Sequence, residues 1–333
     1  IEVIFEPTEG RFLPAFFGVG VTSGRVWYSV LENISGALYS ARPGSSGWEI
    51  QEVAIPPHST VGVKSADATM DMALISIEGF LDPPKTYAAL DGELGEPILA
   101  EEEFFDASRY VVEQHHATSS DGTQIPYFLV RRNDLEFDGA SPTLIYAYGG
   151  FGLAMLPSYV GAVGGGDVLV PWLNAGGTFV LANLRGGGEF GPAWHQAAVL
   201  SNRQTAYDDY YAVAEHLIET GVTSPDHLGI KGESNGGLLV SVALTQRPDL
   251  YGAVLSGVPL TDMLNYHTML AGASWMGEYG DPSDPEMRSV LEAYSPFHNV
   301  EADAEYPEAF FYTSTADDRV HPGHARKMVA KLK

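Results

Sequence analysis

Cysteine is absent from this chain of 333 residues, which excludes disulfides, thiolate metal sites and a cysteine nucleophile. Basic residues are also scarce, because 18 Lys and Arg stand against 43 Asp and Glu and give a formal net charge of -25. Neutralising phosphate groups takes clustered Lys and Arg, so this charge argues against nucleic acid and anionic membranes as partners. Such acidity favours solubility and carries little information about the substrate.

Long apolar runs are absent too. No stretch approaches the ~20 apolar residues that a membrane-spanning helix needs, and the N-terminal residues lack the basic-then-apolar pattern of a secretion signal. A hydrophobic content of 45% still suffices for a large core. Since domains commonly hold roughly 100 to 200 residues, the length favours more than one domain. We expect a globular protein with the cytoplasm as default location and a secreted or periplasmic one as alternatives; the oligomeric state is left open.

Two patterns divide the chain. Up to residue 108, short β-rich segments such as 26–30 and 73–77 alternate with turn residues, which is typical of antiparallel arrays such as propeller blades. From residue 109 on, apolar strands alternate with helical segments, which predicts a mostly parallel sheet with covered faces. We therefore predict two domains, residues 1–108 and 109–333.

A Gly-x-Ser-x-Gly pentapeptide at residues 232–236 lies between an apolar strand and an apolar helix. A strand that turns into a helix within two residues forces Ser234 into a strained backbone conformation and brings its neighbours close together. Residues without Cβ are therefore needed at Gly232 and Gly236. This arrangement would expose the Ser234 hydroxyl as a nucleophile; a glycine-rich turn that happens to contain a serine is the plainer alternative.

An acid follows the serine in the order that serine hydrolases of this kind require, which is Ser, then Asp or Glu, then His. Asp317 comes after an apolar strand at residues 309–313 and before a turn. Its carboxylate could orient a histidine that activates Ser234. An acidic surface loop is the alternative interpretation of this Asp pair.

Four motifs stand together in one order and spacing, and a fifth segment precedes them. They are YAYGGFG at 146–152, NLRGGGEFG at 183–191, GESNGG at 232–237 and DDRV at 317–320, after SSDGTQIPYF at 119–128. As a set they resemble the prolyl oligopeptidase family of serine peptidases, over most of the chain from residue 113 to its end. The resemblance implies an α/β-hydrolase domain preceded by the last blades of an antiparallel β-propeller.

The resemblance also implies roles for individual residues. Ser234 would be the nucleophile and Asp317 the triad acid, while the backbone N–H of Asn235 and the phenol of Tyr148 would form the oxyanion hole. Both groups suit that task, since an N–H next to the nucleophile and a Tyr hydroxyl at a strand end can donate to a developing negative charge. A buried structural tyrosine is the alternative for Tyr148.

Specificity for proline is implied by the same resemblance. The proline-binding wall would consist of Trp275 and Tyr279, because a flat indole suits a pyrrolidine ring. Arg319 would hold a substrate carbonyl. An apolar pocket would be completed by Phe151, Leu260 and Val320. Relatives that cleave after Arg or Lys carry paired carboxylates near this wall, and those carboxylates are missing here.

The triad histidine departs from the family pattern. Only His321 and His324 follow Asp317, both within its loop or the start of the next helix, so neither fits the base well. We expect a fragment that lacks the catalytic histidine beyond Lys333, begins inside a propeller at Ile1, and has little or no turnover.

Other functions were weighed against a proline-specific peptidase of short peptides. A carboxylesterase or an exopeptidase could use the same scaffold, and a non-catalytic fragment could merely bind peptides. Residues 186–191 also fit Gly-x-Gly-x-x-Gly, but a phosphate cradle should open directly onto a helix, and the first strong helix signal comes near Tyr207. With no His-Glu-x-x-His or Gly-x-x-x-x-Gly-Lys motif present, no metal or nucleotide cofactor is expected.

Overall fold

The computed structural model describes residues 2–8, 10–13, 18–160 and 169–333. Residues 1, 9 and 14–17 of the predicted first domain lie outside the described residues, as do 161–168 of the second. The chain divides into two compact units: the first holds Ile1–Val112, Leu156–Pro171 and Glu189–Gly191, and the second holds Glu113–Met155, Trp172–Gly188 and Pro192–Lys333. The first continuous segment of the first unit ends at Val112, and two segments of the later sequence join that unit.

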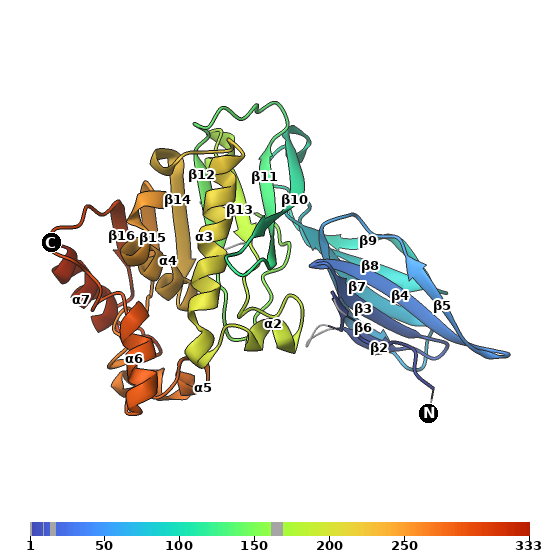
Figure 1. Ribbon diagram of the computed structural model, residues 1–333. Coiled ribbons are helices and arrows are strands. Elements are labelled where there is room, and N and C mark those ends of the chain that lie inside the picture. The colour runs from blue at the N-terminus through green and yellow to red at the C-terminus, as the bar shows by residue number, and fades with distance from the viewer. Residues whose placement is uncertain (1, 9, 14–17, 161–168) are drawn as a thin grey trace. The chain divides into compact units, whose positions relative to one another are not determined.

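The first unit contains two antiparallel sheets (Figure 1). One has the order β1-β3-β4-β5 with β2 also paired to β3, and the other has the order β6-β7-β8-β9. Their bounds are β1 Arg11–Phe12, β2 Val19–Val21, β3 Val26–Glu32, β4 Ser35–Gly44, β5 Gly47–Val53, β6 Ser59–Asp67, β7 Met72–Gly79, β8 Lys85–Leu90 and β9 Glu93–Ala100. The two sheets share a core in which Trp27 of β3 packs with Val61 of β6 and Ile75 of β7. Sequential antiparallel sheets of about four strands are the blades of a propeller.

The second unit is built on one seven-stranded sheet with the order β10-β11-β13-β12-β14-β15-β16. Strand β11 is antiparallel to β13, and the strands from β13 to β16 are parallel to their neighbours. Their bounds are β10 Tyr110–Thr118, β11 Gln124–Arg132, β12 Thr143–Ala147, β13 Thr178–Ala182, β14 Leu228–Glu233, β15 Ala253–Gly257 and β16 Glu308–Tyr312. β12 and β13 are buried along their whole length, as apolar strands covered on both faces should be.

Helices cover this sheet, and the longest two, α3 and α4, pack against each other and against its strands (Figure 1). The helices are α1 Leu169–Asn174, α2 Pro192–Gln196, α3 Gln204–Glu219, α4 Asn235–Gln246, α5 Met276–Tyr279, α6 Pro285–Tyr294 and α7 Gly323–Leu332. Ten residues of α4 in a row are buried, which matches its apolar sequence. Within the described residues, no helix combines the length and apolar character needed to cross a membrane.

Candidate active site

Ser234 occupies the turn between β14 and α4, with φ 58° and ψ -115°. A positive φ is costly for a residue with a side chain and persists only where surrounding structure enforces it. A Cβ at Gly232 would lie 2.3 Å from the carbonyl oxygen of Gly236, and one at Gly236 would lie 2.7 Å from that of Ala147. A larger residue at either position would collide with a backbone carbonyl, as expected at a turn that brings neighbouring residues close together. The turn has the geometry of a nucleophile elbow.

A pocket of about 300 Å³ opens beside Ser234. Besides Ser234 itself, six of its lining residues were predicted as site residues from the sequence: Tyr148, Phe151, Leu260, Trp275, Tyr279 and Arg319. Leu153 and Ser274 also line it and were not predicted, since their only signal is proximity in sequence to Phe151 and Trp275. The rings of Phe151 and Tyr279 meet edge to face with centroids 5.5 Å apart. The aromatic side chains form an apolar part of the pocket wall, and Ser234, Ser274 and Arg319 contribute polar groups.

Tyr148 lines the same pocket as Ser234. Burial raises the pKa of this phenol, and the raising outweighs the lowering caused by Ser234 and the positive charge of Arg319. Tyr148 therefore keeps its proton through the neutral range and remains a hydrogen-bond donor. A protonated phenol beside a serine hydroxyl is suited to stabilise negative charge that develops next to that serine.

Asn235, the first residue of α4, has a fully buried side chain. Its Oδ1 accepts hydrogen bonds from Tyr279 Oη at 2.7 Å and Arg203 Nη2 at 2.7 Å, and its Nδ2 donates to the carbonyl of Tyr148. These contacts join the residue after Ser234 to two pocket residues. The side chain thereby fixes the orientation of the backbone N–H proposed for the oxyanion hole.

Asp317 lies in the loop after β16, as expected. Its Oδ1 accepts hydrogen bonds from the backbone N–H groups of Arg319 at 3.0 Å and Val320 at 2.9 Å. Arg319 lines the same pocket as Ser234, so the loop that carries Asp317 borders that pocket. Val320 is buried behind this loop and is not among the pocket-lining residues.

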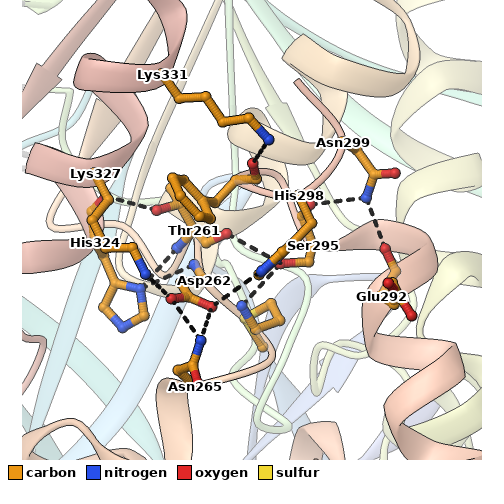
Figure 2. Close-up of polar contacts among 12 residues, drawn as sticks. Thr261, Asp262, Asn265, Glu292, Ser295, His298, Asn299, His324, Lys327 and Lys331 are labelled. Carbon is orange, nitrogen blue, oxygen red and sulfur yellow. Dashed lines mark hydrogen bonds and ion pairs between the residues drawn. The ribbon is translucent and has the colours of Figure 1, made fainter. Parts of the chain in front are cut away.

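The loop that follows Leu260 is anchored to α7 by a buried polar cluster (Figure 2). His324 Nδ1 accepts hydrogen bonds from the backbone N–H groups of Thr261 at 3.2 Å and Asp262 at 3.1 Å. Asp262 is fully buried and contacts Lys327. Burial alone would raise the pKa of Asp262, but hydrogen bonds from Lys327 and Asn265 outweigh it and lower that pKa. The cluster therefore connects the loop after the pocket residue Leu260 to α7, the helix that follows the Asp317 loop.

The histidines near these elements have other partners. His324 is 1% exposed, and burial lowers its pKa to about 4, so it is neutral at pH 7 and serves as an acceptor for backbone amides. His321 is exposed and its Nδ1 accepts from the backbone N–H of Gly323 at 2.9 Å. His195 Nε2 lies 2.8 Å from Glu278 Oε2. Among the described His, Asp and Glu residues, no group of three or more is arranged to hold a metal ion.

The seven-stranded sheet, the strained serine turn and the acid loop define an α/β-hydrolase, here preceded by propeller-type antiparallel sheets. A sequence model of the prolyl oligopeptidase family matches residues 167–333. The chain belongs to that family of serine peptidases.

Relatives of known sequence agree with this assignment. The chain is 48% identical over 330 residues to "Uncharacterized peptidase y4nA" of Sinorhizobium fredii, covering 98% of this chain and 44% of that protein. It is 36% identical over 291 residues to the prolyl endopeptidase of Elizabethkingia miricola, covering 86% of this chain and 40% of that one. The chain therefore spans less than half the length of these relatives.

Solved structures show the same fold. A post-proline cleaving enzyme from Rickettsia typhi superposes with a TM-score of 0.88 at 39% identity, covering 99% of this chain and 47% of that one. Prolyl oligopeptidase B from Galerina marginata, bound to a 35mer hydrolysis and macrocyclization substrate, gives a TM-score of 0.89 at 25% identity, covering 99% of this chain and 45% of that one.

Proposed function

We propose that this chain carries most of the active site of a serine peptidase that cleaves short peptides on the carboxyl side of proline. One observation carries the proposal: the strained Ser234 opens on a pocket walled by Trp275, Tyr279 and Phe151. A pyrrolidine ring fits against flat aromatic faces, whereas a cationic side chain would lose its hydration there, because no described Asp or Glu lines the pocket. The names of the prolyl endopeptidase and post-proline cleaving relatives support the same substrate class.

The proposed reaction passes through an acyl-enzyme. Ser234 Oγ attacks the carbonyl carbon of the proline residue while a histidine takes the hydroxyl proton, and Asp317 orients that histidine. The phenol of Tyr148 and the N–H of Asn235 donate to the oxyanion as the tetrahedral intermediate forms. The histidine then returns the proton to the leaving amine, the C–N bond breaks, and the Ser234 ester is later hydrolysed by water.

The histidine of this mechanism is proposed to lie in sequence beyond Lys333. His324 is occupied by the backbone amides of Thr261 and Asp262, and His321 by that of Gly323. Loss of a triad member typically costs several orders of magnitude in rate. Residues 1–333 alone are therefore expected to turn over little substrate, and rapid burst acylation of Ser234 in this chain by a proline ester would contradict that expectation.

Substrate preference tests the proposal most simply. A protein extended to the length of its relatives should cleave N-blocked chromogenic amides with proline at the cleaved position at least tenfold better, in kcat/KM, than those with alanine or arginine. Trp275→Ala should reduce this preference, because it removes the indole wall. Equal rates on proline and arginine substrates would refute the proposed specificity.

A further inference from the structure

Glu278 is a nearly buried carboxylate that contacts the pocket wall from behind. Only 5% of it is exposed, and it lies directly before Tyr279 in α5. Its Oε1 accepts a hydrogen bond from the backbone N–H of Phe151 at 2.7 Å, over a sequence separation of 127 residues. Its Oε2 lies 2.8 Å from Nε2 of His195. One side chain thus joins three separate segments next to the pocket.

Arg203 extends this connection to the residue after the nucleophile. Its side chain is fully buried, with Nη1 donating to Glu278 Oε1 at 3.2 Å and Nη2 donating to Asn235 Oδ1 at 2.7 Å. The guanidinium also lies over the rings of Tyr207 and Tyr279, with its carbon 5.7 and 5.5 Å from their centroids. Nη1 also donates to the carbonyl of Ala198 at 3.3 Å, and a planar group held by three acceptors and two rings has little freedom to move.

Glu278 and Arg203 contact Phe151 and Asn235, two residues whose positions affect the shape of the proposed peptide-binding site. Phe151 has φ 57°, a conformation that a residue with a side chain adopts only when its surroundings impose it. The hydrogen bond from its N–H to Glu278 supplies part of that constraint. Asn235 is held by Arg203 and Tyr279 together. Removing the Glu278 charge would leave the Arg203 guanidinium buried without its counter-ion, a costly state.

We propose that Glu278 is a positioning residue for the peptide-binding site, acting on the Phe151 wall directly and on Asn235 through Arg203. His195 supports it by fixing the second carboxylate oxygen. This inference rests on the proposed function, since it assigns Glu278 a role in holding the pocket that takes proline. Nothing in the sequence pattern around Glu278 distinguishes it from an ordinary surface acid; its role follows from the contacts.

The test measures binding by isothermal titration calorimetry to this chain, which needs no turnover. The probes are acetyl-Ala-Ala-Pro and acetyl-Ala-Ala-Ala, each with a free carboxylate. The variant is Glu278→Gln, and the matched control is Glu113→Gln, whose carboxylate contacts Arg131 at 2.7 Å and His115 at 3.7 Å on the β10–β11 edge. The proline peptide should bind Glu278→Gln at least tenfold more weakly, with a reduced preference over the alanine peptide, and should bind Glu113→Gln within twofold of the unaltered chain.

Each outcome separates the inference from the function on which it rests. If the unaltered chain does not prefer the proline peptide, the proposed function fails and the inference fails with it. If the unaltered chain and Glu278→Gln show the same affinity and the same preference, only the inference is overturned. Should Glu278→Gln not fold, the partly exposed His195→Ala decides instead: a threefold or larger loss of proline-peptide affinity supports the network, and no loss overturns it.

Discussion

At the scale of single residues, the chemistry of the site depends on environment more than on residue type. Tyr148 is one of 17 tyrosines, and its place in the pocket of Ser234 is the reason that we propose it as an oxyanion donor. The sequence identified it only through a motif, YAYGGFG, whereas the structure adds its place in the pocket of Ser234 and a phenol pKa that burial raises. The proposed role of Tyr148 therefore rests on its surroundings rather than on its residue type.

Replacement of Tyr148 by Phe tests that role in a protein extended to the length of its relatives. We expect kcat to fall by roughly 10- to 1,000-fold, as for loss of one oxyanion-hole donor, with KM little changed because the interaction forms mainly in the transition state. Steady-state kinetics measure both constants. Tyr211→Phe, which removes a buried phenol bonded to Gln246, is the control and should keep the parent kcat. An unchanged kcat in Tyr148→Phe would remove Tyr148 from the mechanism.

At the scale of elements, the serine turn is the most constrained feature of the second unit. Gly232→Ala would place a methyl group 2.3 Å from the carbonyl oxygen of Gly236. Because the clashing atom belongs to the backbone and cannot rotate away, we expect this variant to lower the free energy of unfolding by about 1–3 kcal/mol, typical of overpacking. Urea denaturation measures this change. Gly277→Ala meets nothing within 4 Å and should change stability by less than about 0.5 kcal/mol. Equal effects of the two variants would show that the turn tolerates a Cβ.

The attachment of α7 to the loop after Leu260 should depend on pH through His324. Burial lowers the folded-state pKa of His324 to about 4 from the ordinary 6.5, so between these values the unfolded chain binds a proton that the folded chain does not. The stability present above pH 6.5 is therefore lost as pH falls toward 4, by on the order of 3 kcal/mol for this group. Urea midpoints at pH 7 and pH 5 measure the loss.

His324→Asn provides the control, because the Asn side-chain oxygen can accept from the same amides without titrating. It should lower stability at pH 7 but show a smaller change between pH 7 and pH 5 than the unaltered chain. If both proteins lose the same stability over this range, other groups carry the pH dependence.

The strands and helices of the core were largely predictable from the sequence. The apolar runs 143–148, 178–183 and 253–256 predict strands, and β12, β13 and β15 match them to within one residue, because burial on both faces demands continuous apolar sequence. α3 begins at Gln204, three residues before the predicted start at Tyr207. β9 was not predicted, since most of it is exposed and its polar residues give no alternation.

At the scale of the whole molecule, the site gathers residues that are far apart in the sequence. The motifs indicated Ser234, Asp317 and most of the residues that line the pocket, because each lies next to glycine or aromatic signatures. The sequence could not show that Glu278 bonds to Phe151 or that Arg203 bonds to Asn235, since long-range pairing follows from tertiary packing. The contact of His195 with Glu278 is likewise invisible in the sequence, because 83 residues separate the two.

Replacement of the nucleophile tests the central claim most directly. A protein extended to the length of its relatives, assayed on an N-blocked Gly-Pro chromogenic amide, should lose at least about 1,000-fold in kcat/KM when Ser234 becomes Ala, with unfolding free energy nearly unchanged. Retention of activity within tenfold of the parent would contradict the account, because the proposed acyl-enzyme cannot form without that hydroxyl.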